Sequence, residues 1–277
     1  MINTSNTTEK YSSENATVES KFRATFIQKL GKLQIALSTP GAWRARRAGC
    51  YFEPYKMFYR LGRMGISPKT ILDIGANRGM FSKCAHYVFP DAFIFAFEPL
   101  NDCYEELVGL ARSIQNIECY NVAISDRDGE SVIHRSSYDY SSSLLEMDDL
   151  HKAAFPQSGQ ERVEKIKLER LDAILANKCI TRPLLMKIDV QGYETFVLDG
   201  AVQTLQQTDY IICEMSFRSL YREQGLFDEV YQKLVNKGFQ FVGHVAELQH
   251  PKTGEVLQID GLFISRTNSG EVGSGRR

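Results

Sequence analysis

The sequence predicts an α/β fold built around a mostly parallel β-sheet, and three observations favour it. Short apolar runs at residues 71–74 and 92–97 have the length and composition of buried parallel strands. Between them, residues 81–88 carry a helical pattern, so strand and helix alternate along the chain. A chain of 277 residues with 43% hydrophobic content is long enough to enclose the core that such a sheet needs.

The composition excludes several classes of protein. A formal net charge of −1 provides no basic field for nucleic acid. The six cysteines lack the Cys-x-x-Cys spacing of zinc and redox sites, so we expect reduced core thiols. No apolar run reaches the roughly 18 residues of a membrane span, and the N-terminus lacks the apolar region of a signal peptide. The chain is therefore predicted to be soluble and cytoplasmic.

The chain divides into four predicted segments. Residues 1–20 are rich in Ser, Thr, Asn and Glu, and residues 267–277 in Gly and Ser, so both are expected to be disordered tails. Residues 21–67 form a helical extension. The α/β domain occupies residues 68–266. Neither tail is expected to carry chemistry.

The helical extension begins with an amphipathic helix over residues 21–37. Most of its Lys and Arg residues lie off an apolar stripe of Phe22, Phe26, Leu30, Leu33 and Leu37. An aromatic helix follows over residues 51–66. We expect the first helix to fold onto the domain with a solvated basic face. The alternative is peripheral contact of residues 21–47 with an anionic membrane or an acidic partner.

A glycine-rich turn follows the first strand and is the centre of the predicted site. Gly75 allows a sharp turn, and Gly79 would leave room for a ligand against the backbone at a helix N-terminus. The Gly-x-Gly-x-x-Gly pattern of dinucleotide sites fails here, because Asn77 and Met80 replace two glycines. An NAD-linked oxidoreductase is therefore disfavoured. Asp73 and Asn77 instead suit a ligand with an ammonium and a carboxylate, such as the methionine end of S-adenosylmethionine; a purely structural turn is the alternative.

The second strand, residues 92–97, ends in Glu98 and Pro99. An acid at this position can accept hydrogen bonds from both ribose hydroxyls of a nucleoside. The competing interpretation is that Glu98 caps the next helix, predicted over residues 101–113. A third strand, residues 117–124, carries Asn121, Val122 and Ala123 to the same edge, where they are candidates to line an adenine.

The middle of the chain is less regular. A short strand is predicted at residues 132–134, followed by an irregular excursion over residues 138–160. Long excursions in compact domains often cover a binding site. An edge strand at residues 163–168 and a helix at residues 170–175 complete this part.

Two further strands, residues 184–189 and 209–213, deliver Asp189 and Glu214 to the carboxyl edge of the sheet. With Glu98, three acids thus end three separate strands at the edge where open α/β sheets bind ligands. A last helix is predicted at residues 227–237. Strands at 239–245 and 258–264 then close the sheet in antiparallel fashion.

Five motifs in order resemble the FkbM-type S-adenosylmethionine-dependent methyltransferases. They are Ile71-Leu-Asp-Ile-Gly-Ala-Asn-Arg-Gly-Met-Phe-Ser82, Phe97-Glu-Pro99, Asn121-Val-Ala-Ile-Ser-Asp126, Ser141-Ser-Ser-Leu144 and Lys187-Ile-Asp-Val-Gln-Gly-Tyr-Glu194. The resemblance covers about residues 68–265. It implies a Rossmann-like class I methyltransferase fold, with a seven-stranded sheet whose last strand is antiparallel. It also implies methyl transfer to a hydroxyl of a sugar, glycan or natural product.

The resemblance assigns cofactor roles by position. Asp73, Gly75 and Asn77 would hold the methionine portion, Glu98 the ribose, and Asn121 to Ala123 the adenine. The full set implied for S-adenosyl-L-methionine is Asp73, Gly75, Ala76, Asn77, Gly79, Phe81, Glu98, Pro99, Asn121, Val122, Ala123 and Asp189.

Catalysis needs a group that aligns the acceptor oxygen and removes its proton. Asp189 is the first candidate for base or substrate orienter, with Gln191 and Glu214 as supporting groups. Alternatively, Asp189 caps the following helix while Glu194 reaches back to the helix N-terminus, or Asp189 and Glu214 hold a divalent metal. A non-catalytic scaffold that binds S-adenosylmethionine is the second class of function.

Overall fold

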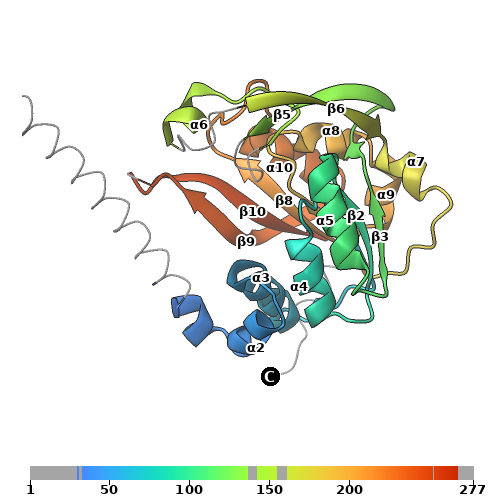
Figure 1. The fold of residues 1–277 in the computed structure, drawn as a ribbon, viewed down its shortest axis with the longest axis vertical. Coiled ribbons are helices and arrows are strands. Elements are labelled where there is room, and N and C mark those ends of the chain that lie inside the picture. The colour runs from blue at the N-terminus through green and yellow to red at the C-terminus, as the bar shows by residue number, and fades with distance from the viewer. Residues whose placement is uncertain (1–29, 31–32, 137–141, 155–160, 252, 268–277) are drawn as a thin grey trace, which may run out of the picture.

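The computed structural model describes residues 30, 33–136, 142–154, 161–251 and 253–267 (Figure 1). The tail predicted at residues 1–20, most of the helix predicted at residues 21–37 and nearly all of the C-terminal tail lie outside these residues.

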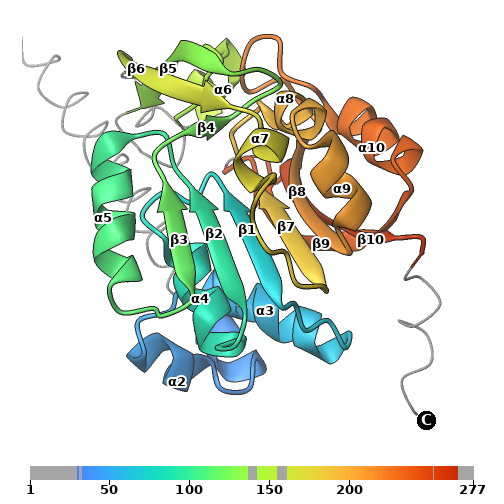
Figure 2. The ribbon, with the colours of Figure 1, turned by 90° about the vertical axis from the view of Figure 1, so that its right-hand side faces the viewer.

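The domain is built on a seven-stranded sheet with the strand order β3-β2-β1-β7-β8-β10-β9 (Figure 2). Its strands are β1 (Thr70–Ile74), β2 (Phe93–Phe97), β3 (Ile117–Tyr120), β7 (Leu184–Ile188), β8 (Tyr210–Ser216), β9 (Phe239–Gln249) and β10 (Val256–Ser265). Among these described strands, β10 alone runs antiparallel to its neighbours β8 and β9. The predicted sheet, including its antiparallel last strand, is confirmed.

Helices cover both faces of this sheet, and the alternation of side chains along each strand divides the core in two. Ile71 of β1 packs in one cluster with α3 (Phe52–Arg63) and α4 (Met80–Val88). Leu72 and Ile74 pack in the other with α8 (Glu194–Asp199) and α10 (Phe227–Asn236). This division follows from the two-residue period of a strand. Other described helices of the domain include α5 (Asn101–Ala111), α7 (Leu171–Leu175) and α9 (Val202–Gln207).

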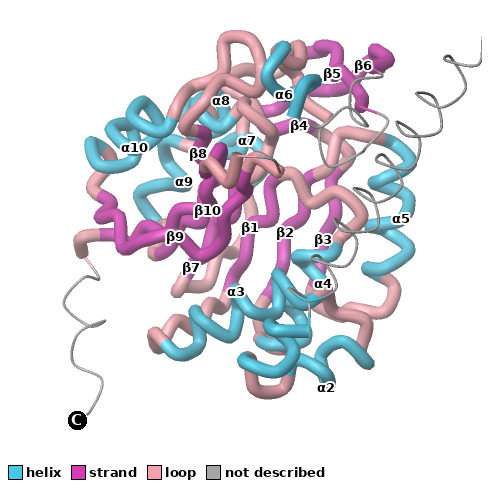
Figure 3. The backbone as a smooth tube through the Cα atoms, turned by 90° about the vertical axis from the view of Figure 1, so that its left-hand side faces the viewer, coloured by secondary structure: helices cyan, strands magenta, loops and turns pink. Residues whose placement is uncertain are grey.

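A second, three-stranded sheet lies over the carboxyl ends of the main strands (Figure 3). It has the order β4-β6-β5, formed by β4 (Ala123–Ile124), β5 (Gly129–Ser136) and β6 (Glu161–Glu169). The prediction of one continuous third strand over residues 117–124 is therefore wrong. Pairing with β2 ends at Tyr120, and the chain then crosses to pair with β6 instead.

Two other expectations for this region need correction. The strand predicted at residues 163–168 as an edge strand is central in the small sheet, because β4 and β5 pair with its two sides. The excursion contains a helix, α6 (Asp149–Ala154), where only irregular structure was expected. Residues 137–141 and 155–160 of the excursion lie outside the described residues.

The N-terminal extension joins the domain through α2 (Ala42–Arg47) and α3, whose buried side chains belong to the core around α4. The leucine stripe before α2 behaves differently. Leu30, Leu33 and Leu37 are all exposed, so the expectation that this stripe packs on the domain is wrong for these three residues. Among the described helices, none is long and apolar enough to cross a membrane.

Candidate functional site

An open cavity lies at the carboxyl ends of β1 and β2, beneath the small sheet. Its floor includes Gly75 and Asp189, and Glu98 lies on its wall. Its apolar lining includes Val122 and Ala123, two of the residues that were predicted to line an adenine. The carboxyl edge of the sheet is where open α/β folds bind ligands, so this cavity is the leading candidate for a cofactor site.

The glycine turn is dictated by contacts within the protein. Gly75 has φ +79°, and a Cβ there would lie 1.9 Å from the carbonyl oxygen of Asp189, so the close approach of β1 and β7 requires glycine. A Cβ at Gly79 would meet the side chains of Leu107 and Leu110 on α5. The room beside Gly79 is therefore taken by α5, which corrects the expectation that a ligand lies there.

Glu98 is only 4% exposed and holds two parts of the site together. Its carboxylate accepts hydrogen bonds from the backbone N–H of Asn77 (2.8 Å) and of Leu100 (2.9 Å), the residue that precedes α5. Burial raises the pKa of Glu98 to about 7, against the lowering effect of these backbone donors. The acid thus supports the start of α5 and also faces the cavity, where its remaining lone pairs can accept further hydrogen bonds.

Asp73 lies behind the site, within β1, and is fully buried. Its carboxylate accepts a hydrogen bond from the hydroxyl of Ser82 (2.7 Å) and lies 3.5 Å from the amine of Lys187. Burial raises its pKa, which Lys187 and Ser82 counteract. Asp73 lines neither the first cavity nor the second one described next, so it supports the site from behind these cavities.

A second cavity adjoins the first and shares Gly75, Asn77 and Asp189 with it. Lys187 lies in its wall, with its amine 3.2 Å from the carboxylate of Asp189 and 3.2 Å from the carbonyl oxygen of Gly75. Burial opposes protonation of Lys187, but the carboxylates of Asp189 and Asp73 raise its pKa overall. The lysine therefore stays charged beside the turn. Ala76, Phe81 and Asp260 also line this cavity.

Gln191 bridges two of the predicted catalytic acids. Its side-chain amide nitrogen donates hydrogen bonds to the carboxylate of Asp189 (2.9 Å) and to both carboxylate oxygens of Glu214 (3.0 and 3.2 Å). Its amide oxygen accepts a hydrogen bond from the hydroxyl of Tyr221 (3.0 Å), which fixes the orientation of the amide. The backbone of Gln191 has φ +56°, a conformation uncommon outside glycine that clusters at functional sites.

Glu214 lies inside β8, two residues before its end, and not after the strand as predicted. It therefore does not line the first two cavities and borders another one near Asp260. Burial raises its pKa well above the ordinary value, and the charge of Asp189 adds to this.

The alternative that Asp189 caps the next helix is not what the structure contains. The turn before α8 is held by Glu194, whose carboxylate accepts from the backbone N–H of Val190 (3.2 Å) and Gly192 (3.1 Å). Asp189 instead bonds to Gln191 and pairs with Lys187. Among the described residues there is no group of three or more His, Cys, Asp or Glu side chains placed to hold a metal.

Of the other predicted residues, some line the first cavity and others support the backbone around it. Pro99 lines the first cavity. Asn121 lies at the crossing between the two sheets and donates from its side-chain amide to the carbonyl oxygens of Glu98 and Pro99 (3.0 Å each), so it supports the end of β2. Sequence reasoning missed Lys187 and Tyr221. The two-residue period of β7 places Lys187 on the same face as Asp189 and could have found it, but no local signal identified Tyr221.

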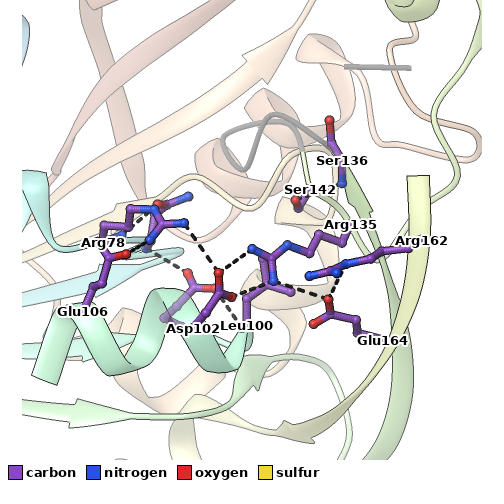
Figure 4. Close-up of polar contacts among 11 residues, drawn as sticks. Arg78, Leu100, Asp102, Glu106, Arg135, Ser136, Ser142, Arg162 and Glu164 are labelled. Carbon is purple, nitrogen blue, oxygen red and sulfur yellow. Dashed lines mark hydrogen bonds and ion pairs between the residues drawn. The ribbon is translucent and has the colours of Figure 1, made fainter. Parts of the chain in front are cut away.

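An ion-pair chain, also missed from sequence, connects the glycine turn to the small sheet (Figure 4). Arg135 of β5 is nearly buried and forms two hydrogen bonds, of 2.5 and 2.6 Å, with the carboxylate of Asp102 in α5. Asp102 also pairs with Arg78 of the glycine turn (3.5 Å), and Arg135 with Glu164 of β6 (3.3 Å). Two-point pairing of Arg with a carboxylate fixes relative orientation, so the roof of the first cavity is held to its floor.

The sheet topology, the glycine turn after β1 and the acid after β2 together define a Rossmann-like class I methyltransferase. The chain belongs to the methyltransferase FkbM domain family, whose model matches residues 73–241. Its cofactor is accordingly S-adenosylmethionine.

Individual relatives are more distant. The 2-O-methyltransferase NoeI of Sinorhizobium fredii is 30% identical over 166 residues, which are 56% of this chain and 66% of that protein. Methyltransferase sdnD of Sordaria araneosa is 24% identical over 200 residues, 64% of this chain and 76% of that protein. Fibrillarin of Aeropyrum pernix, solved with S-adenosyl-L-methionine, has a TM-score of 0.43 at 11% identity and 76% coverage of each chain.

Proposed function

We propose that this protein is an S-adenosylmethionine-dependent O-methyltransferase acting on a hydroxyl of a sugar, glycan or other natural product. The observation that carries the proposal is the pair of cavities meeting at Gly75, Asn77 and Asp189 in a chain of a methyltransferase family. The similarity to NoeI, a 2-O-methyltransferase, supports oxygen as the methylated atom.

The first cavity suits the adenosine. Val122, Ala123 and Leu144 give an apolar slot for the base, and Glu98 presents acceptors to the ribose hydroxyls. Because the carboxylate of Glu98 already anchors the glycine turn through Asn77, ribose binding at Glu98 and the shape of the turn depend on each other.

The second cavity suits the amino-acid end of the cofactor. Asp189 and Asp260 offer negative charge to an ammonium, and Lys187 offers positive charge to a carboxylate. Asp73 then acts indirectly, because its carboxylate pairs with the amine of Lys187 on the side away from the cavity. Several buried acids near a single lysine make the site favourable for a ligand that carries a sulfonium and an ammonium.

Asp189 is the residue we assign to the acceptor. When bound, S-adenosylmethionine supplies a methyl group already activated by the sulfonium, so the protein has to align an acceptor hydroxyl and take its proton. The carboxylate of Asp189 lines both cavities and is oriented by Gln191 and Lys187. In this proposal Asp189 would accept the hydroxyl proton, while the bound cofactor would supply the methyl group and keep the sulfur as a neutral thioether.

Calorimetric titration with S-adenosylmethionine, S-adenosylhomocysteine and NAD tests the cofactor. We expect the first two to bind and NAD not to bind. Incubation with methyl-labelled S-adenosylmethionine and a panel of sugars, glycans and amines tests the acceptor. Label in a hydroxyl would support the proposal, whereas label only in amines, or cofactor binding with no transfer to any member of the panel, would overturn it.

A further inference from the structure

Large apolar side chains are exposed in the segment that precedes the domain. Leu30, Leu33, Leu37, Trp43 and Tyr51 are 48%, 44%, 75%, 53% and 47% exposed. Leu33 and Leu37 lie one turn apart on the helical residues 33–38, while Ile35 and Ala36 between them are buried. Single exposed apolar residues are ordinary on a protein surface, but Leu30, Leu33 and Leu37 line one open hollow together and so form a patch.

Positive charge accompanies these side chains. On α2, the buried residues Ala42 and Ala45 face the core, so helical spacing places Trp43, Arg44 and Arg47 on the outer side. Arg46 is also exposed, with its guanidinium 5.3 Å from the centre of the Tyr51 ring.

The charge around α2 and α3 is strongly one-sided. Residues 33–69 contain seven Arg or Lys and a single acid, Glu53, in a chain whose formal net charge is −1. No ion pair between described residues involves Arg44, Arg46 or Arg47. The positive charge of α2 is therefore available to an external partner.

We propose that this surface binds the anionic face of a phospholipid bilayer. We call it the basic–apolar face and define it by Leu30, Leu33, Leu37, Trp43, Arg44, Arg46, Arg47 and Tyr51. Exposed leucines can enter the acyl boundary, tryptophan and tyrosine favour the headgroup level, and arginines attract anionic lipids. A nucleic acid or acidic protein would account for the arginines but leave the leucines unexplained.

The location of the face leaves the cofactor site accessible. Figure 2 shows α2 at the end of the molecule opposite the small sheet, which covers the first cavity. No member of the basic–apolar face lines either of the two cavities of the candidate site. Membrane binding and cofactor binding can thus be measured independently, and failure of one does not decide the other.

Co-sedimentation of the full chain with vesicles tests the proposal. The probes are vesicles of phosphatidylcholine alone and of phosphatidylcholine mixed with phosphatidylserine, at low and at physiological salt. We expect binding to the mixed vesicles that weakens with salt, and little binding to the neutral ones. The triple variant Arg44→Gln/Arg46→Gln/Arg47→Gln should bind the mixed vesicles roughly tenfold more weakly or worse, and Leu33→Gln/Leu37→Gln should also weaken binding.

A matched triple variant, Arg127→Gln/Lys165→Gln/Lys237→Gln, removes three exposed positive charges elsewhere and should bind like the wild type. Circular dichroism and cofactor titration verify that each variant is folded. Equal sedimentation with both kinds of vesicle, or equal losses in the two triple variants, would overturn the proposal. So would retention on a nucleic acid or an acidic protein with no binding to mixed vesicles.

Discussion

At the scale of the residue, the site depends on how one side-chain amide is shared. Gln191 donates to Asp189 and Glu214 at once and is oriented by Tyr221. Because Glu214 has a strongly raised pKa and Asp189 pairs with Lys187, the two acids differ in environment although they share a donor. The raised pKa means that Glu214 holds a proton more readily than an ordinary carboxyl group does.

Replacing Asp189 by Asn tests the assignment of the base. The substitution keeps the shape but removes the proton acceptor, so kcat should fall by about 10²–10⁴-fold. Cofactor affinity, measured by calorimetry, should fall by a smaller factor than kcat, because Asp260 still offers negative charge to the ammonium. Asp228→Asn, on the exposed start of α10, is the matched control and should turn over like the wild type. Near-normal turnover in Asp189→Asn would remove Asp189 from the chemistry.

Replacing Glu98 by Ala tests the ribose contact. We expect cofactor binding to weaken by about 1.5–3 kcal/mol, the usual range for hydrogen bonds to a charged group. Part of this loss would come from the freed N–H groups of Asn77 and Leu100. Glu98→Gln, which keeps one acceptor, should lose less. If calorimetry finds the affinity of both variants within a few tenths of a kcal/mol of the wild type, Glu98 serves the start of α5 alone.

At the scale of the element, β1 and β7 meet too closely for any side chain at Gly75. Gly75→Ala should destabilise the protein by about 3 kcal/mol or more, because the new Cβ collides with the Asp189 carbonyl and φ is positive. Urea denaturation measures this. Gly62, in α3, has open space within 4 Å of the point where a Cβ would lie, so Gly62→Ala should stabilise slightly. Equal stability of the two variants would contradict the steric argument.

Most elements of the main sheet were predictable because each is a short apolar run between turn signals. Residues 71–74, 92–97 and 184–189 carry this pattern, and β1, β2 and β7 lie there. The division of residues 117–124 into β3 and β4 was not predictable, since the apolar pattern continues unbroken while the pairing partner changes. For the site, the acids that follow the apolar runs, Glu98 and Asp189, could be recognised in the sequence. The contacts of Asp73 with Ser82 and Lys187 arise only when three separate elements pack together.

At the scale of the whole molecule, the carboxyl edge of the sheet brings together acidic side chains whose pKa values are raised. Burial raises the pKa of both Glu98 and Asp260 to about 7, from 4.5 and 3.8, and the charge of Asp189 adds to the shift at Asp260. Between the ordinary pKa values of these carboxyl groups and about pH 7, the folded protein therefore still holds protons that the unfolded chain has released. The stability these groups contribute is present at low pH and is lost as the pH rises to about 7.

Urea midpoints measured between about pH 5 and pH 8 check this prediction. Stability of the unliganded protein should decline less with rising pH in Glu98→Gln than in the wild type. His151, whose pKa burial lowers to about 4, contributes the opposite slope, so the comparison of the two proteins isolates the acid. Cofactor affinity should rise over the same window, because a cationic ligand favours the ionised carboxylates. Identical pH profiles for the two proteins would contradict the raised pKa of Glu98.

The small sheet has a consequence for how the acceptor can change. It is inserted between β3 and β7, yet β1 pairs directly with β7, so the floor of the site closes without it. The entropic cost of a longer connection grows slowly with its length, so this roof tolerates insertions and deletions. Residues 129–169 can thus be exchanged while the sheet and the ion pair of Arg78 and Asp102 remain, but Ile133 and Leu144 of this segment also line the first cavity. The roof can therefore vary without rebuilding the sheet, but every such change also reshapes the slot proposed for the adenosine.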